Sequence, residues 1–362
     1  MTVEDVSVRP SRALAVRGTA RPAATCLSVP DPAQPLPDTA QRAVLLPTQP
    51  EPGPPAPVRA DPVQPGSVPA GSVPAGQQRT SVIHAYLRSH TGAVYCIDYP
   101  ESPHTEANGL NDRGEVTGFY TLDGQVHGYL RGANGWYTTF DVPDAAESTT
   151  EPLGINNEGQ VVGGYLDPDG VGHGFLRDQW GRIGSLDVPG ATSTLATGVN
   201  DRGEVVGAFQ DPDGVIHGFH RDPGGRFSTI DVPGSRLTIV SRANDKGQII
   251  GVFSQTCAEF PTPPGETHGF VLDARGYSLF EVPGGADPAP NGITDAGRII
   301  GGYTNQDGVI GVFELSGHRF RTFIVPVAKS LCPAYDINDR GDVVGVYDTD
   351  DVRTGAAGSP HS

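Results

Sequence analysis

A motif that recurs at intervals of roughly 44 residues is the feature that most limits the folds open to this chain. An Asn-Asp-x-Gly element, or a close variant of it, begins at Asn111, Asn156, Asn200, Asn244, Thr294 and Asn338. A second element, His-Gly-aromatic, begins at His84, His127, His173, His217 and His268, with Ile310 in the sixth place. A period of this length is typical of the blades of a β-propeller.

Within each copy, glycine-bearing turns separate four short apolar segments, as in 195–200, 204–209, 215–221 and 227–232. Each copy is therefore predicted to be a four-stranded antiparallel meander. The Asn-Asp-x-Gly element supplies the positive φ that a tight turn needs. With 49 Gly and 34 Pro along the chain, long helices are disfavoured, so the predicted fold class is all-β.

The two ends of the array are out of phase with each other. The first element present is a third strand near His84, and the last is a second strand at 342–347. Joining them completes one blade and closes a six-bladed β-propeller of four-stranded antiparallel blades over residues 81–349. A solenoid would instead need two unlike capping repeats, and none is evident.

The segments outside the array differ in composition. Residues 1–80 hold nearly half of the 34 prolines and a tandem Gly-Ser-Val-Pro-Ala repeat, which predicts a disordered Pro-rich N-terminal tail. Residues 350–362 are predicted to be a short disordered C-terminal tail. The start of the chain shows no uninterrupted apolar stretch of the kind found in a secretory signal peptide.

Each histidine of the second element is followed at a constant distance by a carboxylate. The pairs His84 and Asp98, His127 and Asp141, His173 and Asp187, and His217 and Asp231 are each 14 residues apart, and Glu281 lies 13 residues after His268. A hairpin with this spacing places both members on facing positions of adjacent strands. In the sixth copy Ile310 and Ile324 stand 14 residues apart, which suggests that an apolar pair replaces the polar one.

These pairs are interpreted as structural rather than catalytic or metal-binding, because a group repeated in every blade cannot converge on one substrate. The sequence also lacks a nucleophile elbow, a His-Glu-x-x-His motif and a phosphate loop. No cofactor is expected. The turns with Asp167 and Asp169, and with Asp211 and Asp213, could bind Ca²⁺ weakly, but plain hairpin turns are the favoured interpretation.

The chain has a net charge of −17, and Lys246 and Lys329 are its only lysines. Nucleic acids and anionic membrane surfaces both require clustered cations, so neither is an expected partner. No apolar run is long enough to span a bilayer. The expected protein is a monomer without membrane insertion.

The Gly-Ile-Asn-x-x-Gly-x-Val-Val-Gly segment followed by His-Gly-Phe resembles the repeats of the HAF family of probable extracellular repeat proteins. The resemblance covers residues 82–348. It implies an extracellular or surface-exposed propeller and brings no catalytic residues with it.

Function is expected where the repeat is broken. The insertion 254–267 contains Cys257, Glu259 and Phe260, and the irregular segment 327–333 contains Lys329 and Cys332. The first connects a second strand to a third and the other connects two blades, so both lie on the same face of the predicted propeller, which should be acidic and polar. Glu259, Phe260 and Lys329 are the candidate ligand-binding residues.

A disulfide between Cys257 and Cys332 is a hypothesis that depends on export to an oxidising compartment. The favoured function is non-catalytic recognition or scaffolding, with a protein or a glycan bound through this loop face. A glycan site would need exposed aromatic residues, and Trp136 and Trp180 are expected on the opposite face. The alternative is a hydrolase or lyase with an axial active site.

Overall fold

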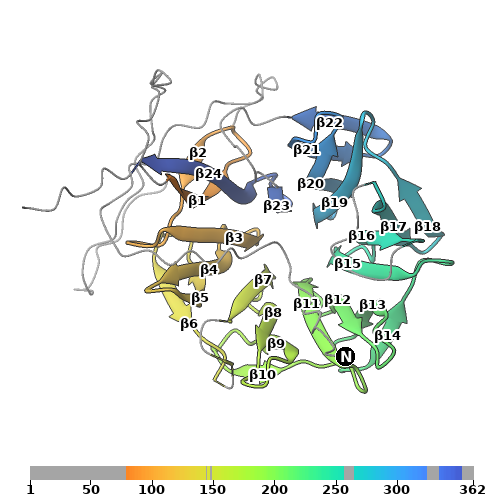
Figure 1. The fold of residues 1–362 in the computed structure, drawn as a ribbon, viewed down its shortest axis with the longest axis horizontal. Coiled ribbons are helices and arrows are strands. Elements are labelled where there is room, and N and C mark those ends of the chain that lie inside the picture. Colours follow the sequence, from red (N-terminus) through yellow and green to blue (C-terminus); the bar gives the residue numbers. More distant parts are fainter. Residues whose placement is uncertain (1–78, 144, 147–148, 257–264, 324–333, 353–362) are drawn as a thin grey trace, which may run out of the picture.

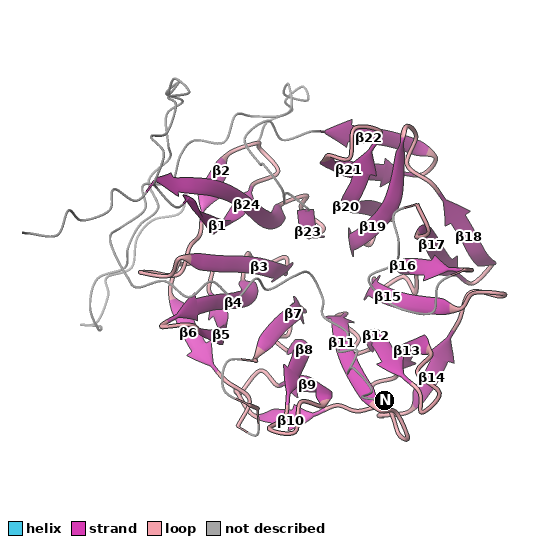
Figure 2. Ribbon diagram, viewed as in Figure 1, coloured by secondary structure: helices cyan, strands magenta, loops and turns pink. Residues whose placement is uncertain are grey.

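The computed structural model describes residues 79–143, 145–146, 149–256, 265–323 and 334–352. These residues form β-strands, turns and loops, as Figure 2 shows, which confirms the predicted all-β class. None of the described segments is a helix of the length and apolarity needed to cross a membrane. Most of the predicted tails, 1–80 and 350–362, lies outside the described residues. The exceptions are 79–80, which belong to β1, and 350–352, which belong to β24.

The described strands form antiparallel groups of four, and single parallel residue pairs, Ile83 opposite His104 and Ile216 opposite Leu237, join two pairs of neighbouring groups into eight-stranded sheets. One group combines the two ends of the chain: β1 (Arg79–Arg88), β2 (Val94–Cys96), β23 (Ala334–Ile337) and β24 (Val343–Val352). The next two groups are β3 (His104–Leu110), β4 (Val116–Leu122), β5 (Gln125–Arg131) and β6 (Tyr137–Phe140), then β7 (Glu151–Ile155), β8 (Val161–Leu166), β9 (Gly172–Arg177) and β10 (Ile183–Ser185).

Three further groups follow in chain order. They are β11 (Ser193–Val199), β12 (Val205–Gln210), β13 (Ile216–Arg221) and β14 (Phe227–Ile230); β15 (Leu237–Ala243), β16 (Ile249–Ser254), β17 (His268–Asp273) and β18 (Gly276–Phe280); and β19 (Gly285–Ile293), β20 (Arg298–Asn305), β21 (Ile310–Ser316) and β22 (Arg319–Phe323). Figure 1 shows the groups arranged in a circle, and the strands nearest its centre are β23, β3, β7, β11, β15 and β19.

Strands from the two ends of the chain share one sheet. β24 runs antiparallel to β1 over ten residue pairs, from Arg79 opposite Val352 to Arg88 opposite Val343. β23 pairs with β24 on one side, and β2 pairs with β1 on the other. This antiparallel pairing joins the two ends of the chain in one sheet, as the sequence predicts for the ends of the array.

The core lies between neighbouring groups and includes one buried aromatic residue on the third strand of five groups. Tyr129, Phe175, Phe219, Phe270 and Phe313 are at most 1% exposed, and each contributes roughly 2–3 kcal/mol by burial. Each stands opposite a glycine of the second strand. At Gly207 a Cβ would lie 2.7 Å from the Phe219 ring and 2.0 Å from the Leu195 carbonyl oxygen, so the repeated glycine is a packing requirement.

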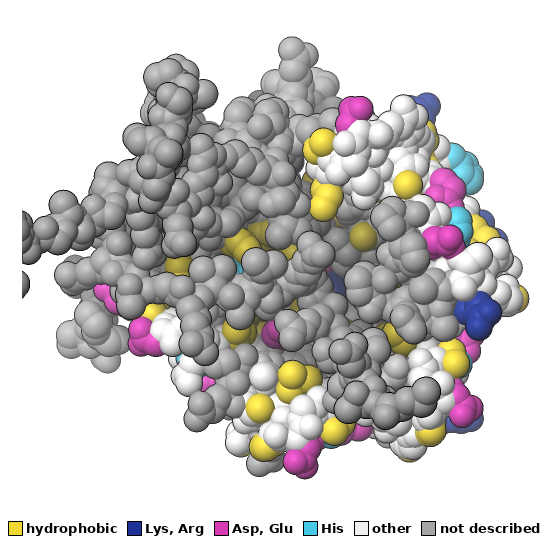
Figure 3. Space-filling model, in the orientation of Figure 1, with side chains coloured by type: hydrophobic (Ala, Val, Ile, Leu, Met, Phe, Trp, Pro, Cys, Tyr) yellow, Lys and Arg dark blue, Asp and Glu magenta, His cyan; other side chains and the backbone are white. Residues whose placement is uncertain are grey.

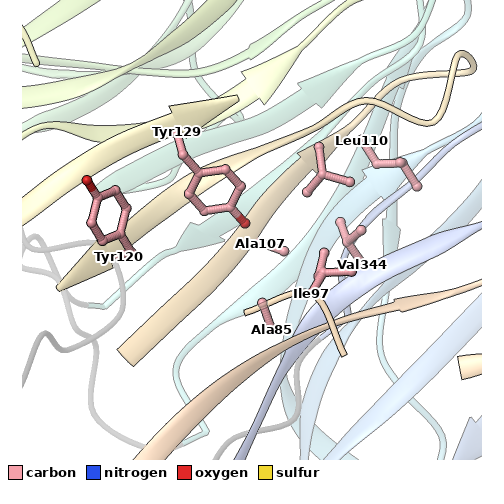
Figure 4. Packing of buried hydrophobic residues seen from close by; sticks show 8 residues of the cluster. Ala85, Ile97, Ala107, Leu110, Tyr120, Tyr129 and Val344 are labelled. Atoms are coloured by element: carbon pink, nitrogen blue, oxygen red, sulfur yellow. The ribbon is translucent and has the colours of Figure 1, made fainter. Parts of the chain in front are cut away.

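The group formed by both chain ends packs in the same way. Ala85 and Ile97 from β1 and the residues after β2 meet Val344 of β24, and this surface packs on Ala107 and Leu110 of β3, as Figure 4 shows. The cluster therefore joins strands that are more than two hundred residues apart in the sequence, and it ties the chain ends to the group that follows them.

Candidate functional site

The five predicted histidine–carboxylate pairs are all in contact. The Nδ1 atoms lie 2.6 Å from Asp98 at His84, 2.9 Å from Asp141 at His127, 3.1 Å from Asp187 at His173, 3.0 Å from Asp231 at His217 and 2.5 Å from Glu281 at His268. Each histidine is on the third strand of its group, and each carboxylate follows the end of the fourth strand. The pairs therefore link the outer edge of each group to its interior.

Glu281 keeps the register of the other carboxylates. Gly269 pairs with Phe280, so the next position outward places Glu281 directly opposite His268. The hairpin between β17 and β18 is one residue shorter than its counterparts, which explains the spacing of 13. The spacing of 13 therefore reflects a shorter hairpin and not a shifted register.

Each of these imidazole rings also lies against an aromatic ring of the neighbouring second strand, which sequence reasoning missed. The centroid distances are 5.0 Å for His84 and Tyr347, 5.4 Å for His127 and Tyr120, 5.3 Å for His173 and Tyr165, 5.2 Å for His217 and Phe209, and 5.3 Å for His268 and Phe253. The signal was present, because an aromatic residue follows the buried glycine of each second strand by two positions.

The sixth group does not contain the predicted apolar pair. Tyr303 pairs with Gly311, just as Phe209 pairs with His217, so Gly311 and not Ile310 stands at the histidine position. A Cβ at Gly311 would lie 2.6 Å from the Tyr303 ring, which fills the space that a histidine occupies elsewhere. Ile310 is instead 37% exposed, and Ile324 lies outside the described residues.

Two of the histidines contact a second carboxylate. His173 Nε2 lies 3.3 Å from Asp167 Oδ2, and His217 Nε2 lies 3.2 Å from Asp211 Oδ2. The other oxygen of each aspartate accepts backbone N–H groups of its own turn, from Val171 in one case and Val215 in the other. This use of both carboxylate oxygens supports the hairpin-turn interpretation of the Asp-x-Asp-Gly segments over the Ca²⁺ interpretation.

The Asn-Asp-x-Gly turns form a ring around the axis. In each turn the second residue donates its backbone N–H to the side chain of its counterpart in the next group, and the last step returns from Asp339 to Asp112. The acceptors are Asn157, Asp201, Asp245, Asp295, Asp339 and Asp112, at 2.6–2.9 Å. These repeated turn residues are therefore occupied in holding the groups to one another.

The carboxylates of this ring influence one another's pKa values. Burial, together with the charges of Asp201 and Asp295, raises the pKa of Asp245 above its ordinary value. Burial raises the pKa of Asp339 as well; the hydrogen bond from the Asp295 N–H acts in the opposite direction, and the charges of Asp112, Asp295 and Asp201 add to the rise. At the one ring position that has an amide, Asn157 Nδ2 lies 2.7 Å from Asp112 Oδ2 and 2.6 Å from Asp201 Oδ2.

The residue two positions before each of these turns faces the axis, and it breaks the repeat in two groups. The position is glycine at 109, 154, 198 and 292, but it is Arg242 and Asp336 in the other two groups. At Gly154 a Cβ would lie 3.0 Å from the Gly198 Cα atom, so the innermost strands approach too closely for larger residues to be repeated. Arg242 and Asp336 are therefore a non-repeated pair at the centre of the molecule.

The Arg242 guanidinium closes the axis. It donates to the backbone carbonyls of Asn108 and Leu153 at 2.8 Å each, and to those of Thr197 and Ser241. These four residues are β-bulge residues of four different inner strands. The remaining nitrogen, Nε, lies 3.7 Å from Asp336 Oδ1.

Asp336 is buried, and both of its carboxylate oxygens accept backbone N–H groups. Its Oδ2 accepts the N–H of Leu110 at 3.0 Å, and its Oδ1 accepts that of Ile337 at 2.9 Å. Burial raises the pKa of this carboxyl above its ordinary value, although Arg242 acts in the opposite direction. The pair bridges strands from both ends of the chain and leaves little free hydrogen-bonding capacity for a ligand.

The predicted ligand-binding residues Glu259, Phe260 and Lys329 lie outside the described residues, as do Cys257 and Cys332. Their roles stay predictions. Cys96 is disulfide-bonded, and its partner also lies outside the described residues. His84, Cys96 and Asp98 come within 4.8 Å of one another, the one such grouping in the described part of the chain, but a disulfide sulfur is no thiolate ligand for a metal ion.

The two faces of the ring differ in charge. We call the face that bears the connections from second to third strands and between groups the acidic face. Within the described residues, these connections and the strand residues adjoining them contain two arginines, Arg236 and, at the start of β1, Arg79. Their carboxylates are Asp98, Glu101, Asp123, Asp141, Glu151, Asp167, Asp169, Asp187, Asp211, Asp213, Asp231, Glu266, Glu281 and Asp307.

The opposite face, which we call the mixed-charge face, contains most of the described cations. They are Arg88, Arg113, Arg131, Arg177, Arg182, Arg202, Arg221, Arg226, Lys246, Arg275, Arg298, Arg319 and Arg340. Here they alternate with the carboxylates of the axial ring and of the outer turns. Figure 3 shows Asp and Glu side chains spread around the margin of the side of the molecule that it presents.

Exposed apolar side chains also separate by face. Leu166 and Val171 flank one turn of the acidic face, and Val309 and Ile310 follow another, all being 36–41% exposed. The exposed aromatic residues are on the mixed-charge face, where Trp180 is 73% exposed and the Arg182 guanidinium lies 5.0 Å from its ring centre. The acidic face thus combines carboxylates with aliphatic residues.

Comparison with known proteins identifies the fold of this chain but does not identify its activity. No family model and no curated protein matches the sequence. The structure is similar to that of a putative TolB from Agrobacterium tumefaciens, with 12% identity, a TM-score of 0.53, and coverage of 75% of this chain and 99% of the other. It also matches TolB from Acinetobacter baumannii, with 15% identity, a TM-score of 0.49, and coverage of 67% and 62%. The chain therefore has a β-propeller fold.

Proposed function

We propose that this protein is a non-catalytic recognition module that binds a basic polypeptide through its acidic face. The observation that carries the proposal is the separation of charge. The described connections of that face combine many carboxylates with two arginines, whereas most of the described cations gather on the opposite face. A surface with one sign of charge attracts partners of the other sign and speeds their association.

The apolar side chains favour a polypeptide over a glycan. Leu166, Val171, Val309 and Ile310 give the acidic face aliphatic contact points beside its carboxylates. A sugar ring packs best on an exposed aromatic face, and the two tryptophans are on the opposite side. A chain with Lys or Arg among apolar residues matches both features. Glu259, Phe260 and Lys329 lie outside the described residues and remain the ligand-binding residues that the sequence predicts for this face.

The alternative function, a hydrolase or lyase with an axial active site, is disfavoured by the backbone hydrogen bonds that the axial residues Arg242 and Asp336 already make. Arg242 and Asp336 are the non-repeated ionisable residues there, and backbone groups occupy most of their polar atoms. A catalytic acid or base needs a free position within hydrogen-bonding reach of a substrate. Two further elements of the proposal are a closed six-bladed ring, supported by the β1–β24 pairing, and a HAF-like extracellular or surface location.

The test is a binding screen with the full chain against arrays of peptides and glycans. Lys- and Arg-rich peptides that contain Leu or Val should bind, and their affinity should fall as salt is added, since exposed charges are screened. Acidic peptides and neutral glycans should give no signal. Preferential binding of a glycan, or of acidic peptides, would overturn the proposal. Turnover of an ester, peptide or glycoside that Arg242→Ala abolishes would favour the enzyme instead.

Matched variants locate the site. Asp169, Asp213 and Asp307 are exposed, and their side chains have no hydrogen bond or ion pair among the described residues. Changing each to Asn should weaken basic-peptide binding, and combining them should weaken it further. Glu158→Gln removes the same charge from the mixed-charge face and should leave binding unchanged. Equal effects from both sets would show that net charge alone is responsible.

A further inference from the structure

In the groups β7–β10 and β11–β14 the imidazole ring of the third strand stands between two carboxylates. At His217, Nδ1 faces both oxygens of Asp231 at 3.0 and 3.1 Å, and Nε2 faces Asp211 Oδ2 at 3.2 Å. His173 has the same arrangement, with Asp187 at 3.1 Å and Asp167 at 3.3 Å. Both imidazole nitrogens therefore meet hydrogen-bond acceptors.

Only the protonated ring satisfies this geometry. A neutral imidazole has one N–H and one lone pair, so it can donate to one carboxylate and must turn a lone pair toward the other. An imidazolium donates at both nitrogens, and both bonds are strengthened by charge. The complete bridge from Asp231 through His217 to Asp211 therefore exists while the ring carries its proton.

The two carboxylates belong to different parts of the fold. Asp231 follows the outer strand β14, whereas Asp211 begins the turn between β12 and β13 on the acidic face. Asp211 Oδ1 accepts the N–H groups of Asp213 and Val215 and so shapes that turn, while its Oδ2 is the atom that reaches His217. The bridge thus fixes an acidic-face turn to the outer edge of the sheet.

We propose that His217 acts as a proton-dependent latch that holds the turn Asp211–Val215 of the acidic face, and His173 has the same contact geometry beside the turn Asp167–Val171. When the ring loses its proton, the remaining N–H stays with Asp231, which offers two oxygens at shorter distances. Asp211 then loses its contact to the sheet and keeps only the bonds within its own turn. The turn becomes freer to move and to present its carboxylates to solvent.

Among the described residues, the charged groups in contact with the His217 ring are Asp231 and Asp211. Phe209 of β12 covers the ring face, and β15 approaches β13 with Leu237 opposite Ile216. The titratable group nearby on the next group is Tyr277, whose hydroxyl donates to the Asp231 backbone carbonyl. Burial on its own would lower the pKa of His217, but its bonds to Asp231 and Asp211 outweigh this and raise it.

The chain itself contains comparison groups. His127 and His268 contact one carboxylate each, from Asp141 and Glu281, with no aspartate six residues before the ring. In the sixth group Asn305 takes the turn-shaping place of Asp211, accepting the N–H groups of Asp307 and Val309, and Gly311 takes the place of His217. The carboxylate and the imidazole are thus absent together, as expected if each serves the other.

The experiment follows amide hydrogen exchange and imidazole NMR signals of the full chain from pH 5 to pH 9. Exchange at 211–215, corrected for the intrinsic pH dependence of the chemistry, should accelerate as His217 deprotonates. The turn at Asp123 and Gly124, beside the singly bonded His127, should show no such step. A uniform response of both turns would overturn the proposal.

Two conservative substitutions in one turn provide the decisive comparison. Asp211→Asn keeps an oxygen for the turn N–H groups but removes the charge that faces His217. It should lower the His217 pKa and abolish the pH step in exchange. Asp213→Asn removes an equal charge from an exposed side chain that does not contact the ring, and it should change neither. Identical behaviour of the two variants would show that the ring senses general charge and not the latch.

Discussion

Replacing Arg242 with alanine should destabilise the protein more than any single change to the repeated pairs. The side chain is 13% exposed and makes its hydrogen bonds to four carbonyls at the centre of the ring. Its removal leaves these acceptors, and the 9%-exposed Asp336 carboxylate, without their cation. Breaking a buried charge pair from one side costs roughly 3–5 kcal/mol. For a domain of this size that is a fall in Tm of about 10 °C.

A double-mutant cycle separates the ion pair from the packing. Asp336→Asn keeps an acceptor for the Leu110 N–H but removes the charge, so it should be tolerated better than Arg242→Ala. In the double variant no charge is left unpaired, and the combined loss should be smaller than the sum by at least about 1 kcal/mol. Arg242→Met controls for lost volume, because it fills the axis without donating a hydrogen bond.

The pH dependence gives an independent readout. Without Arg242 the pKa of Asp336 should rise further above its already raised value, because burial remains and the opposing charge is gone. A carboxyl with a raised folded-state pKa destabilises the fold above that pKa and is relieved as pH falls through it. The Arg242→Ala deficit, measured by urea unfolding and circular dichroism, should therefore shrink toward low pH. A deficit below about 1 kcal/mol that does not vary with pH would refute the reasoning.

Three other changes test the repeated elements. Asp245→Asn should stabilise the chain by about 1 kcal/mol at neutral pH and by less in acid, because an amide at this position can donate hydrogen bonds to the neighbouring carboxylates as Asn157 does. Equal or lower stability of the variant in urea unfolding would contradict this. Asp231→Asn should cost only about 1 kcal/mol, because the carboxylate is 42% exposed, and the loss should disappear when His217→Gln is already present. Gly207→Ala should cost several kcal/mol by calorimetry, since its Cβ would overlap the Leu195 carbonyl, whereas Gly184→Ala, with nothing near its Cβ, should cost less than 1 kcal/mol.

The histidine pairs could be predicted from sequence because all facing residues of an antiparallel hairpin have the same sum of residue numbers. One known pair therefore fixes all the others. That sum is fixed by buried contacts and not by turn length, which is why Glu281 keeps its place in a shorter hairpin. The same reasoning, applied to the buried Phe313 opposite Gly301, would have placed Gly311 at the histidine position. Aligning on the apolar Ile310 instead gave the wrong residue.

The axial pair was missed although its signal was visible. The residue two places before the Asn-Asp-x-Gly element is glycine in four copies and Arg242 or Asp336 in the others. Sequence cannot show that a β-bulge turns this position toward the axis, or that Arg242 meets carbonyls from strands that lie up to 134 residues away. The acidic face was predictable because alternate strand connections lie on the same face, so the charges of each set can be read from the sequence. The contacts of Asp211 could not be predicted, because they depend on the three-dimensional shape of its turn.

Removal of β24 tests the central claim most directly, which is that the array closes through the pairing of its two ends. A chain ended after Gly341 lacks β24 and exposes the edge of β1 that pairs with it from Arg79 to Arg88. It should lose the single cooperative transition in calorimetry, whereas a chain lacking residues 1–75 should melt as the full chain does. A truncated chain that still unfolds in one sharp transition at the original temperature would contradict the closed ring.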